Sequence, residues 1–186
     1  QANELREVGA GVQISPNGSR ALYALGVGDA VRSLACEPAG KEVRLWNTGQ
    51  TWKLFDLGAE VYRREAHCIT CHQADGQGLP AAQFPSIAKS DWVGGDPKRL
   101  IRIILHGLMG PIEVNGTKYS GQVPMTAFKG LSDREIAGVS TYVRNAFGNK
   151  GTAVTPAQVA AERKATQAQE GFLVPAELQK QFPLGK

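Results

Sequence analysis

The sequence predicts a mainly helical protein with a small N-terminal α/β segment, made of a helix and a β-hairpin, and a helical C-terminal tail. From Gly58 onward, apolar residues recur at helical spacing behind good helix caps, and no convincing strand pattern is found. Before Gly58, alternating residues flank a Gly-containing turn, which is typical of a hairpin. We therefore expect three segments: residues 1–57, 58–150 and 151–186.

The composition excludes several classes of protein. Of 186 residues, 42% are hydrophobic and 20% are charged, which indicates a globular chain. Charged residues or Gly interrupt every apolar stretch well before 18 residues, so no membrane span is predicted. The 21 Lys and Arg exceed the 17 Asp and Glu only slightly. Because this surplus is scattered, nucleic acid is not an expected partner, although an acidic protein is possible.

The first segment contains helical and strand patterns. Ser15-Pro16 is a good helix start, and apolar residues from Leu22 to Leu34 form a loose helical face. Alternation on both sides of residues 47–50 predicts the hairpin. Cys36, alone in this segment, is expected to be a buried small apolar residue.

The second and third segments contain capped helices and long loops. A helical stretch over 59–67 leads into two cysteines. Asp96-Pro97 caps a second helix, and the box Ser132-x-x-Glu135 opens a third. Thr155-Pro156 begins a helix to about Gln169, and Pro175 a last short turn. The Gly-rich loops between these helices are long, which usually means that loops wrap something.

The motif Cys68-Ile69-Thr70-Cys71-His72 predicts covalently attached haem c. Two thiols three residues apart at a helix start can each reach one vinyl group on the same side of the ring. The next residue then places an imidazole under the iron. Chance would produce this motif on the order of once in a thousand chains. With Cys36 the chain has three cysteines, too few and too odd a number for a disulfide framework.

One histidine leaves the sixth iron position to be filled. A thioether there makes an electron-transfer site and raises its reduction potential. Of the two methionines, Met125 follows Pro124 in an extended loop before the third helix, where it can hold sulfur opposite His72. Met109 lies at the end of the preceding helix and is expected to pack. We predict His72 and Met125 as the iron ligands.

Residues 58–150 resemble a class I cytochrome c domain. The likeness covers the first helix with its Cys-x-x-Cys-His motif, a proline loop at 77–88, and the segment from Met125 to Asn145. Residues 106–119 are similar to the cytochrome c domains attached to quinoprotein dehydrogenases and some copper nitrite reductases. The resemblance implies the class I helical fold around haem c. It also implies that the carbonyl of Pro85 accepts the Nδ1–H of His72 and fixes its tautomer.

Several other residues are candidates for the haem pocket. Trp92 and Tyr119 either line the haem edge or bond a propionate, or they belong to the apolar core. The expected apolar lining is Leu79, Phe84, Ile87, Leu100, Ile104, Phe128 and Val143.

The remaining histidines and two arginines receive plainer interpretations. His106 is expected to line a loop or pocket rather than to bind a metal, and His67 to face solvent. Arg99 and Arg102 are expected on a solvated helix face, from which either could reach a propionate.

Residues 1–57 resemble a different family, the salicylate-hydroxylase-type FAD-dependent monooxygenases. The likeness runs from Glu4 to Gly26 and ends at about Leu57. In that family, this stretch follows the Rossmann glycine motif and the acidic residue that holds the adenosine ribose. Without them this fragment is not expected to bind FAD, and we interpret it as a fused or chimeric remnant.

The leading hypothesis is an electron-transfer module, not an enzyme, that serves a dehydrogenase, reductase or oxidase. Covalent haem implies export to a bacterial periplasm, although no signal peptide is visible. Four alternatives stay open: a flavin monooxygenase fragment; a peroxidase-like haem protein with labile Met125; a redox dithiol; and a zinc site of Cys68, Cys71 and His72 with another histidine. The oligomeric state is not predicted.

Overall fold

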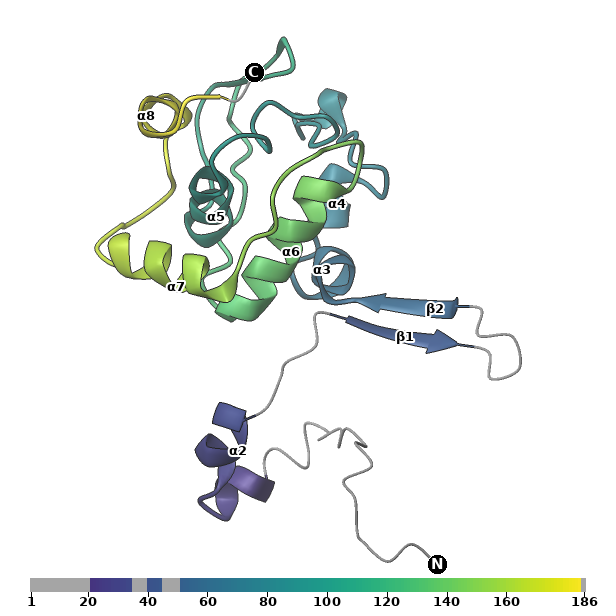
Figure 1. Cartoon of the computed structure of the whole chain (residues 1–186). Helices are drawn as coiled ribbons and strands as arrows, with labels where there is room; N and C mark the ends of the chain where they lie inside the picture. The colour runs from purple at the N-terminus through teal and green to yellow at the C-terminus, as the bar shows by residue number, and fades with distance from the viewer. Residues whose placement is uncertain (1–20, 35–39, 45–50, 185–186) are drawn as a thin grey trace, which may run out of the picture. The chain divides into compact units, whose positions relative to one another are not determined.

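The computed structural model describes residues 21–34, 40–44 and 51–184, and it confirms a mainly helical fold (Figure 1). Contacts divide the chain into two compact units, residues 1–38 and 39–186. In chain order the elements are α2 (Gly28–Leu34), β1 (Gly40–Arg44), β2 (Thr51–Asp56), α3 (Leu57–Glu60), a π-helical turn (Val61–Glu65), α4 (Cys68–His72), a 3-10 turn (Pro80–Ala82), α5 (Pro97–His106), β3 (Ile112–Val114), β4 (Thr117–Tyr119), α6 (Asp133–Asn145), α7 (Pro156–Ala165) and α8 (Pro175–Gln181).

The first unit is described only in its helical part. A helical turn over residues 21–24 is separated from α2 by a bend, where Gly26 has a φ of +75°. Gly28 opens α2 so close to the ring of Tyr23 that a side chain on it would overlap that ring. The predicted helix start at Ser15-Pro16 and the expected burial of Cys36 lie outside the described residues.

The predicted N-terminal hairpin is confirmed and begins the second unit. Strands β1 and β2 pair antiparallel, with Gly40 opposite Asp56 and Val43 opposite Lys53. The register shifts between Val43 and Arg44, a local irregularity in the ladder. The turn at 47–50 lies outside the described residues.

The stretch expected as one helix over 59–67 is interrupted. Asp56 caps α3 by accepting hydrogen bonds from the backbone N–H groups of Gly58 and Ala59. The helix then widens into the π-helical turn, where the N–H of Ala66 donates to the carbonyl of Val61. His67 has a left-handed φ of 47°, so α4 begins as a separate turn.

Helices α3 and α6 cross at two glycines beside the main apolar cluster. A side chain on Gly58 would overlap the backbone of Gly138 and the Cβ of Tyr142. Because only hydrogen fits there, the helices approach closely, and Tyr62 meets Tyr142 and Phe147 in an aromatic cluster with centroids 5.4–5.6 Å apart. In the main apolar cluster, the most buried side chains are those of Val61, Tyr62, Ile101, Leu105, Ile136, Val139 and Val159.

A second hairpin corrects the expectation that residues 58–186 contain no strand. Strands β3 and β4 pair Ile112 with Tyr119 and Val114 with Thr117. Asn115 and Gly116 have φ values of 50° and 79°, and two consecutive positive angles form the tight turn that Asn-Gly favours. The three-residue strands are too short to show an alternating pattern.

The predicted caps of the later helices are confirmed. The carboxylate of Asp96 accepts from the N–H of Lys98 at 2.9 Å, and Ser132 and Glu135 form a capping box. Thr155 and Gln158 form another box at α7. Helix α7 ends at Ala165, four residues before the expected position, and α8 is a helix rather than a single turn.

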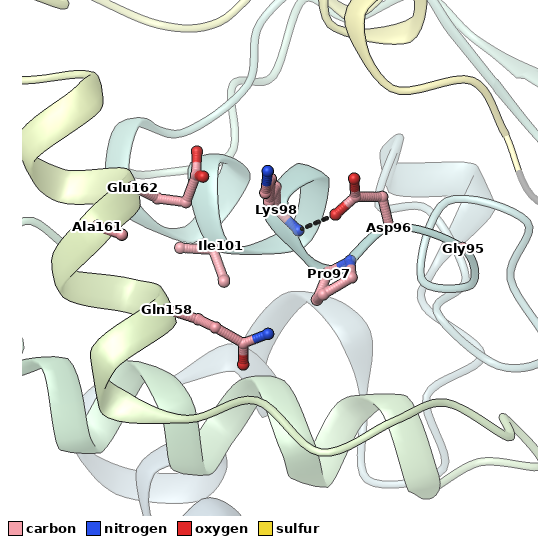
Figure 2. A pocket seen from close by; sticks show the side chains of 8 residues that line it. All are labelled: Gly95, Asp96, Pro97, Lys98, Ile101, Gln158, Ala161 and Glu162. Carbon is pink, nitrogen blue, oxygen red and sulfur yellow. Dashed lines mark hydrogen bonds between the residues drawn. The ribbon is translucent and has the colours of Figure 1, made fainter.

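The C-terminal segment packs on the rest of the second unit, with α7 against α5 and α6 (Figure 1). Arg102 of α5 and Glu162 of α7 form an ion pair of 2.6 Å. The side chain of Arg102 is only 19% exposed, so it does not lie on a fully solvated face as expected. A cavity of about 480 Å³ opens beside this contact, lined by the start of α5 and by α7 (Figure 2).

Arg99 is a clear correction, because its side chain is 0% exposed. Its guanidinium donates at 2.6–3.0 Å to five backbone carbonyls, those of Asp91, Trp92, Gly94, Phe182 and Pro183. The buried Arg144 donates to the carbonyls of Val93, Gly95 and Thr152. Every carbonyl from residue 91 to 95 thus accepts from one of two buried arginines, which is why Arg99 does not face solvent.

Candidate functional site

Helix α4 consists of the five residues Cys68–His72. Residues with positive φ angles precede and follow it, His67 with a φ of 47° and Gln73 with a φ of 61°. The hydroxyl of Tyr62 donates to the carbonyl of Gln73 at 2.7 Å. The motif is therefore an isolated turn, with its exit tied to the aromatic cluster.

The imidazole of His72 is oriented by a backbone carbonyl. Its Nδ1 lies 2.9 Å from the oxygen of Pro85, the contact that the family resemblance implies. Because a carbonyl only accepts, Nδ1 carries the hydrogen and Nε2 keeps a free lone pair. Burial lowers the pKa of His72, and the bond to Pro85 opposes this shift. A neutral imidazole held in one tautomer is what an iron ligand requires.

Gly78 lies close to the carbonyl of Pro85. Its N–H donates to the carbonyl of His72 at 3.1 Å, and its φ is +68°. A Cβ at Gly78 would overlap the carbonyls of Phe84 and Pro85. We expect Gly78→Ala to destabilise the protein by about 2–4 kcal/mol, from left-handed strain plus this overlap. The measurement is urea unfolding of the haem-loaded protein.

Gly116→Ala is the matched control for this prediction. Gly116 has a φ of +79°, but nothing lies within 4 Å of an added Cβ. Gly116→Ala should therefore lose about 1–2 kcal/mol of stability, from left-handed strain alone. Equal losses of unfolding free energy in the two variants would show that the close approach of Gly78 to Pro85 adds nothing to the cost.

The two motif thiols are half-buried and unpaired. Burial raises the pKa of Cys68 to about 11, and it raises the pKa of Cys71. Both are therefore protonated near neutral pH, unlike the low-pKa thiol of a redox dithiol. Within the described ranges, no three His, Cys, Asp or Glu side chains are arranged to hold a metal ion.

The two methionines lie in different environments. Met125 is half-buried and packs against both apolar clusters. Its backbone exchanges two hydrogen bonds with Leu108, of 2.9 and 3.2 Å. Met109 is 47% exposed. Met125 is thus the thioether that sits in an apolar, backbone-fixed position.

The expected apolar lining is graded in burial. Leu100, Ile104 and Val143 are buried, whereas Phe84, Ile87 and Phe128 are half-buried and Leu79 is exposed. Ile87, Phe128, Cys68 and Met125 all pack against the main cluster while keeping some surface uncovered. Haem fits this set: neutral thiols, a neutral imidazole with a free nitrogen, a thioether, and apolar side chains with surface still to bury.

Trp92 and Tyr119 lie in a second apolar cluster with Ile103, Val114 and Leu178. The indole Nε1 of Trp92 donates to the carbonyl of Glu113 at 2.7 Å, so its one donor is used within the protein. Both rings are buried.

The other two histidines differ in exposure. His67 is exposed, as its interpretation requires. His106 is buried at the end of α5, where its Nε2 lies 2.6 Å from Oγ1 of Thr166.

Sequence reasoning missed several residues that support the site. Tyr62 acts through its hydroxyl on the carbonyl of Gln73, and both Gln73 and Gly78 adopt positive φ angles. The sequence shows a glycine after Gln77, but the loops of this chain contain many glycines, so this one alone does not indicate a close contact.

Known proteins are similar to this chain over most of its second unit. The cytochrome c family profile matches residues 55–147. Cytochrome c-552 of Thermus thermophilus is 37% identical, over 58% of this chain and 94% of that protein. The gluconate 2-dehydrogenase cytochrome c subunit of Pantoea cypripedii is 32% identical, over 82% of this chain but only 34% of that subunit.

A partial similarity also extends to an enzyme of another kind. The 3-amino-4-hydroxybenzoate 2-monooxygenase of Streptomyces platensis is 34% identical over 34% of this chain and 16% of that enzyme. In the part of the chain that the structure describes, no helix is long and apolar enough to cross a membrane.

Proposed function

This chain belongs to the cytochrome c family, a family of electron carriers with covalent haem c, and from that premise we propose that His72 and Met125 ligate the iron of its haem. The observation that supports this most is the bond from His72 Nδ1 to Pro85, because it leaves the lone pair of Nε2 free to bind a metal. The predicted haem c cofactor is confirmed by the family and by the spacing of Cys68 and Cys71.

Haem, when bound, supplies an iron that gains and loses one electron. The thiols of Cys68 and Cys71 attach it, and His72 donates a lone pair from Nε2. The carbonyl of Pro85 holds the imidazole in orientation and raises its basicity. A thioether from Met125 favours the reduced state and so raises the potential.

We further propose that the electron partner is a dehydrogenase in a bacterial periplasm. The gluconate 2-dehydrogenase cytochrome c subunit is similar over most of this chain, and haem c attachment is typical of exported proteins. Residues 58–150 would carry the haem and residues 151–186 would extend that domain. Residues 1–57 would be a monooxygenase-like fragment without FAD, in line with the partial similarity to a monooxygenase.

The first test is an acid-acetone extraction of the protein made with a competent haem maturation system. We expect the haem bands to stay with the protein, because thioether bonds survive this treatment. The oxidised protein should show a sulfur-to-iron charge-transfer band that Met125→Ala abolishes. Met109→Ala is the matched control and should keep the band.

Two results would overturn this proposal. Haem that leaves the protein would refute covalent attachment. A band that survives in Met125→Ala but disappears in Met109→Ala would assign the ligand to the exposed methionine instead.

A further inference from the structure

The segment after α6 makes a dense set of contacts near Met125. We call residues 163–174 the strap and residues 123–131 the methionine loop. We propose that the strap positions the methionine loop, so that Arg163 and the other strap residues that contact this loop or the segment beside it control how firmly Met125 holds the iron. This inference rests on the proposed ligation by Met125.

Arg163 makes the strongest of these contacts. At the end of α7, its guanidinium donates to the carbonyls of Lys129 and Leu131 at 2.8 and 2.7 Å. Its Nε also pairs with the carboxylate of Asp133 at 2.8 Å. One side chain therefore contacts Lys129 and Leu131 at the end of the methionine loop and Asp133 just after it. In the opposite direction, Lys129 Nζ donates to the carbonyl of Gln169 at 3.0 Å.

The other end of the strap continues a short backbone ladder that includes Met125. Leu108 pairs with Met125 on one side and with Leu173 on the other. The N–H of Leu173 donates to Gly107 at 3.2 Å, and the N–H of Met109 donates to Leu173 at 2.9 Å. Leu173, Leu108 and Met125 also pack against the same apolar cluster. Leu108 thus lies between Met125 and the strap and is bonded through its backbone to Met125.

A third contact joins the strap to the end of α5. Thr166 Oγ1 donates to the carbonyl of Glu162 at 2.8 Å, so it accepts from the Nε2–H of His106 at 2.6 Å. His106 immediately precedes the Gly107–Leu108 segment that pairs with Met125. Burial lowers the pKa of His106, and Lys129, Arg102 and Arg163 lower it further, which keeps the ring neutral.

Glycine at position 107 shows how tightly these segments meet. A Cβ there would overlap the carbonyl of Met125 and lie 2.8 Å from the ring of Phe172. Strap and methionine loop therefore converge on one backbone position of the segment between them.

The test measures how firmly Met125 holds the iron. Added imidazole competes with the thioether for the oxidised iron, so its apparent affinity rises when Met125 is released more easily. We expect Arg163→Gln to raise this affinity about tenfold, because hydrogen bonds from a charged group are lost. Arg163→Lys should raise the affinity less, because the lysine ammonium can still pair with Asp133.

Two controls separate positioning from general loss of stability. Lys164→Gln removes an exposed charge from the same helix. Asp56→Ala removes the cap of α3, at a cost of about 1 kcal/mol, without touching the strap. Both should leave imidazole affinity within about twofold of the parent protein, since neither loosens Met125.

The outcomes distinguish this inference from the proposed function. If Met125→Ala keeps the charge-transfer band, ligation by Met125 is wrong and the strap has no ligand to position. If that variant loses the band but Arg163→Gln binds imidazole like the parent, the carrier proposal stands and the strap inference is overturned. Equal increases in Arg163→Gln and Asp56→Ala would also overturn it.

Discussion

Arg99→Met is expected to cost about 3–5 kcal/mol of stability, a large share of the roughly 5–15 kcal/mol that holds a natural domain together. Methionine keeps an apolar side chain of similar length but donates no hydrogen bond. The carbonyls of Asp91, Trp92, Gly94, Phe182 and Pro183 would each lose their donor. A buried acceptor without a partner costs about 1–3 kcal/mol, although water can reach some of these five. Urea unfolding of the haem-loaded protein measures the loss.

Two further variants make this prediction specific. Arg99→Lys keeps the charge but has one ammonium group for five acceptors, so we expect about half the loss. Lys98→Met removes an exposed cation from the same helix and should stay within about 0.5 kcal/mol of the parent. A change below about 1 kcal/mol in Arg99→Met would show that water satisfies these carbonyls as well as the guanidinium does.

Local signals in the sequence predicted those features whose cause is itself local. Asp96, Ser132 and Thr155 cap helices because their side chains reach backbone groups two or three residues away. The haem motif depends in the same way on spacing within five residues. The second hairpin had a local signal too, Asn115-Gly116, but its strands are only three residues long.

The features that sequence reasoning missed depend on residues far apart in the chain. The position of Arg99 follows from carbonyls at residues 91–94 and at 182–183, and backbone carbonyls have no sequence signature. A helical arginine beside Lys98 has the same pattern whether it faces solvent or these carbonyls. The strap contacts of Arg163 cross more than thirty residues in the same way.

The candidate site divides along the same line. Cys68, Cys71 and His72 could be predicted from their spacing, and Pro85 from the family resemblance. What holds them is tertiary: the Tyr62 hydroxyl on Gln73 and the close approach of Gly78 to Pro85. A glycine in a loop predicts conformational freedom, but only the structure shows which backbone it must admit.

Removal of a residue that attaches or ligates the haem is expected to have the largest effect of all. We expect Cys71→Ala or His72→Ala to lose most of the helical far-ultraviolet signal of the second unit. The motif helix is one isolated turn, and Ile87, Phe128 and Met125 keep apolar surface that haem would cover. Without haem, the long loops between α4 and α6 would lack the group that we expect them to pack around. The cost approaches the whole free energy of folding, about 5–15 kcal/mol.

Cys36→Ala is the matched control, because it removes a thiol outside the motif. It should keep both the haem and the helical signal. Hydrogen exchange gives the finer measurement: in Cys71→Ala, amides of α5 and α6 should exchange as fast as those of an unfolded chain. If these amides stay protected, the α3–α6 crossing and the two buried arginines are sufficient to fold the unit. Haem would then contribute the redox chemistry without being needed for the fold.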